Sequence, residues 1–305
     1  MGKRSLTEVG VWGLSLRLMR NISGAILCLG FALCASPARA AVNTPLPPLE
    51  KGFQLLYNLD FTSAQQEFSL YQQQHGEDPL GPVSEAAGLL FSEFERLGIL
   101  EAQFYESDAK FEARKKLSPD PEIRKRFDAT LDRADKLAHA RLAKDPKDHD
   151  GLFALTLSSG LKADYAALIE KRNLASLHYT KESTQWSTQL LAVHPDCYDA
   201  HVASGISKYV IGSMSAPVRW ILRVGGVSGD KQAGIAELKL TAEHGHYLAP
   251  FARILLAIAY VREKDKASAR QILASLRDEY PNNPLFAREI ARLDTGNNRL
   301  DTGNK

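Results

Sequence analysis

Residues 249–293 read APFARILLAIAYVREKDKASARQILASLRDEYPNNPLFAREIARL, and this stretch decides the fold. Apolar residues recur at helical spacing from Pro250 to Tyr260, and the polar run over 263–266 is typical of a turn. A second helix is predicted over 267–280 and ends at Pro281, because proline cannot continue a helix. A closing helix is predicted over 284–293. The stretch therefore predicts an antiparallel helix pair followed by one more helix.

The spacing inside this stretch resembles the tetratricopeptide repeat, which is defined by the order of its large, small and proline positions. Counting back from Pro281, Tyr260 falls on the aromatic position, Ala269 on the small position and Leu273 on the large position four residues later. Ala257 stands where the repeat has a glycine or alanine, because the two helices cross closely there. We expect the most regular repeat of the chain at 249–283.

The preceding chain divides into further helix pairs separated by prolines, and strand patterns are nearly absent. The prolines at 146, 195 and 281 are 49 and 86 residues apart, so a strict 34-residue repeat is excluded. We predict an all-α, tetratricopeptide-like alpha solenoid of about five helix pairs over 50–293, with long or insert-bearing repeats. The earlier pairs are predicted at 52–59 with 62–74, 85–106 with 121–144, 151–170 with 174–193, and 199–211 with 231–243.

The first 40 residues have the pattern of a secretory signal peptide. Basic residues precede an apolar run over 22–35, and Ala38-Arg39-Ala40 is a small-x-small cleavage signal. An uncleaved membrane anchor is the alternative, but the run is shorter than the roughly 20 residues that span a bilayer. We expect cleavage after Ala40, an extended linker at 41–49, a periplasmic or secreted protein, and a disordered tail at 294–305.

Cleavage would change the charge and the cysteine content. The leader carries five basic residues and Glu8, so 33 basic and 35 acidic residues would remain and no basic field would point to nucleic acid. Cys197 would be the single remaining cysteine, which is typical of a buried apolar side chain.

The candidate partner-binding surface is the concave face, which the first helix of each pair would line. Asp150 and Asp199 each lie four residues after a proline, and we interpret both as helix N-caps. The apolar residues that follow them could hold a peptide, although burial in the core is the alternative for Phe153, Val202 and Tyr209. In the last pair, Phe251, Ile254 and Ile258 are expected to be covered by the closing helix. The candidate face comprises Asp150, Phe153, Leu157, Asp199, Val202, Ile206 and Tyr209.

Candidate metal ligands are His194, Cys197 and His201, and they define the alternative function of a metal- or small-ligand-binding envelope protein, with a metal-dependent hydrolase as its catalytic form. Three ligands without a fourth at fixed spacing are weak support. No phosphate-binding glycine loop, zinc-protease helix or nucleophile elbow occurs in the sequence. We therefore predict a non-enzymatic protein without a cofactor.

An insert over 213–228 separates the helices of the fourth pair. Its segment Pro217–Val224 reads PVRWILRV, with Arg219 and Arg223 four residues apart. We favour a short helix packed over the end of the solenoid. Weak peripheral contact with a membrane through Trp220 is the alternative.

The residues that carry a family resemblance are Tyr209, Pro217–Val224, Gly229, Asp230, Lys231, Gly234, Leu238, Ala242–Gly245, Pro250–Pro281 and Pro284–Phe286. Through them, the second half of the chain resembles a divergent bacterial group of secreted tetratricopeptide proteins. It is also distantly similar to the family of the fungal inclusion body clearance protein, through its glycine-aspartate turn and the glycine of the next helix. The resemblance implies an all-helical scaffold for other macromolecules and no catalytic motif. We thus expect a non-catalytic scaffold for a protein or peptide partner in the cell envelope.

Overall fold

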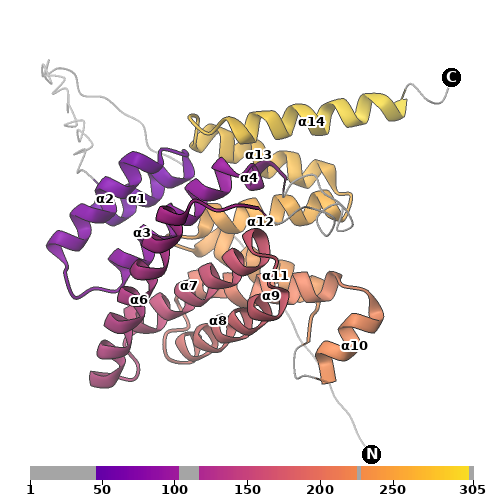
Figure 1. Cartoon of the computed structure of the whole chain (residues 1–305). Helices are drawn as coiled ribbons and strands as arrows, with labels where there is room; N and C mark the ends of the chain where they lie inside the picture. Colours follow the sequence, from indigo (N-terminus) through magenta and orange to yellow (C-terminus); the bar gives the residue numbers. More distant parts are fainter. Residues whose placement is uncertain (1–45, 103–116, 225–227, 302–305) are drawn as a thin grey trace, which may run out of the picture. The chain divides into compact units, whose positions relative to one another are not determined.

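The computed structural model describes residues 46–102, 117–224 and 228–301, which lie within one compact unit, Pro45–Lys305 (Figure 1). The predicted signal peptide and residues 41–45 of the linker lie outside the described residues. Every regular element in the described ranges is helical, as predicted. The main helices are α1 (Pro48–Tyr57), α2 (Phe61–Gln74), α3 (Leu80–Arg96), α4 (Ile99–Ala102), α6 (Pro121–Lys144), α7 (His149–Asp164), α8 (Asn173–Val193), α9 (His201–Ser213), α10 (Ala216–Val224), α11 (Lys231–His244), α12 (Ala249–Arg262), α13 (Lys266–Glu279) and α14 (Pro284–Asp301).

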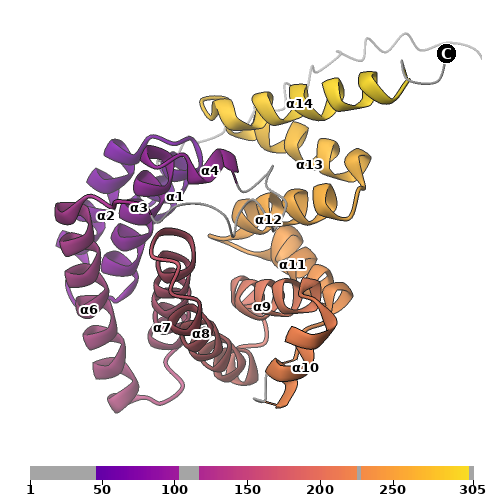
Figure 2. The same cartoon turned by 45° about the vertical axis from the view of Figure 1, so that its right-hand side comes forward.

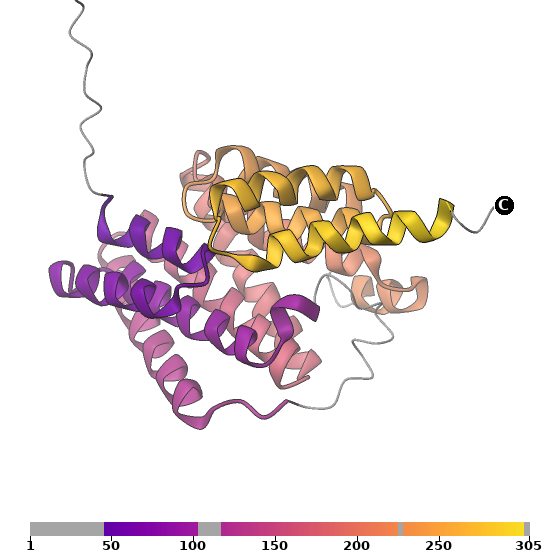
Figure 3. The same ribbon diagram turned by 90° about the horizontal axis from the view of Figure 1, so that it is seen from above.

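The helices pack in consecutive pairs, which confirms the predicted solenoid. The pairs are α1 with α2, α3 with α6, α7 with α8, α9 with α11, and α12 with α13, and α14 packs on α13 (Figures 2 and 3). Neighbouring pairs also pack on one another through α2 and α3, α6 and α7, and α11 and α12. This order is that of a tetratricopeptide-like fold, in which each pair buries its apolar faces against the next.

The α12–α13 pair has the packing that its sequence predicts. Ala257, Ala269 and Leu273 are fully buried, with no measurable exposure. A methyl group at the crossing lets the two helices approach, and a larger side chain there would force them apart. The small residues of the repeat pattern are therefore those that the close approach of α12 and α13 requires.

The turns of the first and last pairs share a backbone geometry that the sequence did not predict. Leu59 and Lys264 both adopt the left-handed backbone region, with φ of 61° and 65°. Each is followed by an aspartate, Asp60 or Asp265, whose side chain accepts a hydrogen bond at 3.1 Å from the backbone N–H three residues later. That contact satisfies one of the free donors at the helix start. The same turn therefore joins α1 to α2 and α12 to α13.

Two predicted boundaries are corrected by the structure. The helix expected over 85–106 begins at Leu80 and stops at Arg96, because Gly98 adopts a φ of 68° that breaks the helix before α4. Disorder was predicted for 294–305, but residues 294–301 continue α14, and 302–305 lie outside the described residues. Extending a helix that is already packed costs little compared with nucleating one, and Arg270 forms an ion pair with Asp294 at 2.8 Å.

The first pair of the series contacts the last pair. The Tyr57 hydroxyl donates to the Tyr247 carbonyl at 2.8 Å, and the Asn283 side-chain amide donates to the Tyr57 carbonyl at 2.9 Å. The Phe53 and Tyr247 rings lie 5.0 Å apart. These contacts join residues about 190 to 226 positions apart. We call them the closing junction, because through them the solenoid bends back and brings α1 against the start of α12.

The insert helix α10 differs from the arrangement that we favoured. It stands clear of the helix pairs (Figure 1), and Trp220 and Val224 are 67% and 73% exposed. The side chain that ties it back is Arg219, which donates to the Gly212 carbonyl at 3.0 Å. The interpretation of α10 as a helix packed over the end of the solenoid is therefore wrong, because Val218, Trp220 and Val224 remain exposed.

Within the described ranges, one helical segment, His149–Ile169, is long and apolar enough to cross a membrane by length and composition alone. Its most apolar window is 67% buried inside the fold, packed against α6 and α8. This burial is what a core helix of a solenoid requires.

Candidate binding pocket

An apolar pocket of about 170 Å³ lies where the first helices of the pairs converge. Side chains of α1, α3, α7, α9 and α12 line it, together with the start of α14. Tyr57 and Asn283 of the closing junction also line this pocket, and its volume suits one or two side chains. Representative lining residues are Phe53, Val83, Leu157, Ile206, Phe251 and Phe286.

The pocket uses part of the predicted binding face. Leu157 of α7, Val202 and Ile206 of α9, and Asp199 just before α9 line it. From the last pair, Phe251 and Ile254 also line it. Val202 is only 6% exposed, so little of its side chain is accessible from the pocket. Leu157 and Ile206 are partly buried and offer more accessible surface.

Phe153 and Tyr209 are core residues and do not belong to an accessible face. Phe153 is 2% exposed and stacks near Tyr247, with ring centroids 6.5 Å apart. Tyr209 is 6% exposed, and its hydroxyl points to the Ala259 carbonyl at 3.4 Å. A charge at either position would disrupt the fold, so neither substitution can test binding.

The N-cap interpretation of Asp150 is wrong. Asp148 caps α7, because its side chain accepts from the Gly151 N–H at 2.7 Å. Asp150 lies in the first turn and contacts His149 Nδ1 at 2.9 Å and Arg141 at 3.1 Å. The hydrogen bond with Asp150 is the main cause that raises the pKa of His149 to about 10, and the same pair lowers the pKa of Asp150. Asp150 therefore belongs to an ion-paired cluster outside the pocket lining.

Asp199 does not cap its own helix either. It lies in the 3₁₀ turn Tyr198–Ala200, is 5% exposed, and accepts hydrogen bonds from three backbone N–H groups. The donors are His246, Tyr247 and Leu248, at 2.9, 2.8 and 3.2 Å. Burial raises the pKa of Asp199, although these donors act to lower it. Asp199 thus organises the loop that leads into α12, on the wall of the pocket.

The candidate metal ligands do not converge. His194 Nε2 contacts the Lys147 carbonyl at 2.8 Å, and the His201 ring stacks near Tyr198 with centroids 6.4 Å apart. Cys197 is partly buried beside the core, where it is a free thiol. No three His, Cys, Asp or Glu side chains in the described ranges are placed to hold a metal ion.

One ionisable lining residue was missed by the sequence analysis. Asp164 ends α7 and lines the pocket together with Leu157 and Leu161. Burial raises the pKa of Asp164 to about 7. The spacing 157, 161, 164 places the three residues on one helical face, and that pattern was the available signal.

Comparison with known proteins adds little beyond the helical architecture. No family model matches the chain, and no curated protein matches it. A solved structure of a thermophilic TPR protein from Thermus thermophilus is similar to it, with a TM-score of 0.42 and 16% sequence identity, covering 81% of this chain and 96% of that chain. At this level of similarity, the fold assignment rests on the helix pairs and the α12–α13 crossing.

Proposed function

We propose that this protein is a non-catalytic scaffold of the cell envelope that binds a protein or peptide partner through the pocket. The observation that carries the proposal is the convergence of apolar first-helix side chains from successive pairs on one cavity. A concave apolar site with a few placed polar groups is the usual form of a binding pocket.

The size of the pocket defines how a partner would bind. A cavity of about 170 Å³ has no room for an extended chain along the whole face. A partner would instead insert one or two apolar side chains, while the rest of its surface contacts the rim. Such central, fully desolvated insertions dominate binding energy at protein interfaces.

The location in the envelope is proposed from residues 1–40, whose composition is that of a secretory leader. Cell fractionation and N-terminal sequencing of the exported protein test this point. A mature chain that begins at Ala41 in the periplasm or the medium supports the proposal. A chain that keeps residue 1 in the cytoplasm refutes the location but leaves the pocket proposal standing.

Filling the cavity tests the pocket directly. Ala203 lines the pocket and is partly buried, so Ala203→Leu places three extra carbon atoms in the space that a partner side chain would occupy. We expect at least a tenfold loss of partner crosslinking, because about 1.4 kcal/mol of lost contact is sufficient for it. Ala140→Leu, on an exposed position of α6, is the matched control and should bind normally. Equal crosslinking by both variants would refute the pocket as the binding site.

A second candidate activity is peripheral contact with an anionic membrane through α10. Its support is the exposure of Trp220 and Val224 beside Arg219 and Arg223, in a helix without acidic residues. Tryptophan with flanking arginines is favourable at a lipid interface. Flotation with phosphatidylglycerol vesicles tests it: Trp220→Ser should reduce flotation, and unchanged flotation would exclude this role.

A further inference from the structure

Asp164 occupies an unusual place in the pocket wall. It is the last residue of α7 and is followed by a π-helical turn, Tyr165–Ile169. π turns are rare and occur frequently at functional sites. Here the turn lies directly beside the carboxyl group that lines the pocket.

The π turn is fixed from outside the pocket. The Arg124 guanidinium lies 4.2 Å above the Tyr165 ring, and the same arginine pairs with Asp128 at 2.6 Å and Glu170 at 2.9 Å. Through its cation–π contact with Tyr165 and its ion pair with Glu170, Arg124 of α6 therefore holds the turn against α6.

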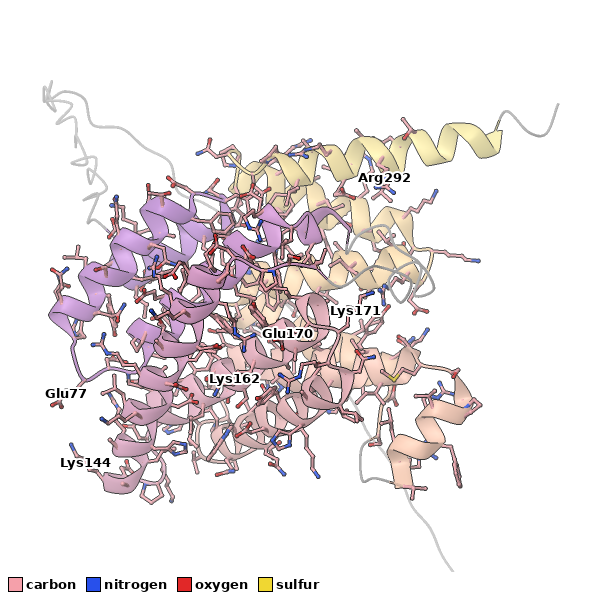
Figure 4. The ribbon with its side chains drawn as sticks, viewed as in Figure 1. Glu77, Lys144, Lys162, Glu170, Lys171 and Arg292 are labelled. Carbon is pink, nitrogen blue, oxygen red and sulfur yellow. The ribbon has the colours of Figure 1, made fainter. Side chains whose placement is uncertain are left out.

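Nearby charged residues on α7 are likewise paired with α6. Lys162 contacts Asp135 at 2.5 Å, and both Lys162 and Glu170 are labelled in Figure 4. The Asp164 side chain is different: it is partly exposed, and no hydrogen bond or ion pair joins it to another described residue. Burial is the cause that raises its pKa to about 7, and no neighbouring charge contributes.

An unpartnered carboxylate in an apolar wall is costly, and the cost falls when a cation or hydrogen-bond donor binds it. The other carboxylate of the pocket, Asp199, already has three donors. Of the two carboxyl groups that line the pocket, only Asp164 therefore lacks a hydrogen-bond donor or a cation among the described residues.

We propose that the pocket recognises an alkylammonium group, supplied by a lysine side chain of the partner. The ammonium binds Asp164, while the methylenes of the lysine and an adjacent apolar side chain contact residues such as Leu157 and Ile206. A lysine side chain carries a compact ammonium group at the end of an apolar stem, which suits a small apolar cavity with one carboxylate. This inference rests on the proposed function and specifies the chemistry of the partner.

A divalent cation fits the site less well. Calcium needs six to eight oxygen ligands, and magnesium needs near-octahedral geometry. No group of three candidate ligands is placed together in the described part of the chain.

The experiment uses the leaderless protein and three probes of equal chain length: octylamine, 1-octanol and octanoate. Calorimetric titration at pH 8.5 keeps Asp164 ionised and the amine charged. We expect octylamine to bind at least tenfold more tightly than 1-octanol, and octanoate to bind most weakly, because charge-assisted pairing favours the first and repulsion opposes the last. The comparison among probes on the wild-type protein requires no variant.

Asp164→Asn keeps the size of the side chain and removes its charge. The octylamine preference should fall to less than threefold while 1-octanol binding is unchanged, and the control Asp132→Asn, on an exposed position of α6, should keep the full preference. An equal preference in Asp164→Asn and wild type would overturn the inference. Binding of no probe would overturn the pocket itself, whereas equal binding of all three would leave the pocket and overturn only the ammonium assignment.

A peptide pair identifies the source of the ammonium. The blocked peptide Leu-Leu-Lys-Leu-Leu should bind at least tenfold more tightly than the same peptide with an Nε-acetylated lysine. Recognition of octylamine without recognition of this lysine would assign the pocket to free amphiphilic amines and overturn the lysine proposal.

Discussion

Two carboxylates that line the same pocket have opposite surroundings. Asp199, beside the closing junction, is held by three backbone donors, whereas Asp164, at the end of α7, has no donor among the described residues. Burial raises the pKa of both. The difference separates a structural carboxylate, whose side-chain hydrogen bonds are internal, from one that is free to bond with solvent or with a ligand.

Removing the structural carboxylate should have the largest effect. Asp199→Ala would leave the N–H groups of His246, Tyr247 and Leu248 without their acceptor, and we expect a loss of about 4 kcal/mol in the free energy of unfolding. Urea denaturation measures this change. Asp196→Ala, on the exposed side of the same turn, is the control and should change stability by less than about 0.5 kcal/mol. A loss below about 1 kcal/mol for Asp199→Ala would contradict its structural role.

Crowding the same carboxylate should cost less. A Cβ atom at Gly245 would lie 2.4 Å from Asp199 Oδ1 and 2.6 Å from the Thr241 carbonyl, so Gly245→Ala must displace one of them. We expect a loss of about 2.5 kcal/mol by the same denaturation measurement. At Gly76 the nearest atom would be 3.8 Å away, so Gly76→Ala is the control. Similar losses at both glycines would show that Asp199 is not tightly enclosed.

Removing the free carboxylate should stabilise the protein, in contrast to Asp199. The folded pKa of Asp164, about 7, lies above the unfolded value of about 3.9, so the folded state retains a proton between these pH values. Its contribution to stability therefore falls as pH rises from about 4 to 7 and is level above that range.

The Asp164→Asn variant should lack this decrease in stability with rising pH, because its side chain does not titrate. Its stability relative to the wild type should increase by about 2 kcal/mol between pH 4 and pH 8, after allowance for screening by pocket water. Thermal unfolding of both proteins across this range provides the measurement, and subtracting the curves cancels the titration of other groups. A constant difference would contradict the raised pKa.

The closing junction itself should respond least to a single change. Tyr57→Phe removes the hydroxyl that donates to the Tyr247 carbonyl and keeps the ring, so we expect a loss of about 1 kcal/mol. Tyr179→Phe is the control, because its hydroxyl has no hydrogen-bond partner among the described residues. If the two losses are equal, the Tyr57 bond does not stabilise the junction.

The sequence predicted local features well. Ala257, Ala269 and Leu273 follow a fixed spacing because a close helix crossing requires small and large residues at set positions, and all three are buried. Pro121 marked the start of α6 to the residue. The predicted N-cap of α7 was wrong. Asp148, two residues before Asp150, is an equally suitable capping residue, and it is the one that caps the helix.

The pocket was predicted only in part. First-helix residues such as Leu157 and Ile206 were identified from periodicity, but their enclosure depends on contacts between Tyr57 and Asn283, 226 residues apart, which leave no local pattern. Asp164 was not predicted as a pocket residue, because an acidic residue at a helix end is expected to face solvent. Only the tertiary structure shows that other helices surround it. Tertiary closure determines which side chains are accessible.

The closing junction also has a consequence for folding. An open solenoid behaves almost as a one-dimensional chain, in which terminal repeats can fray or be deleted with modest effect. Here the two ends stabilise each other, so loss of α13 and α14 would also release α1. We infer that pairs far apart in the sequence unfold together, and that a long loop must close before those contacts form, which slows folding.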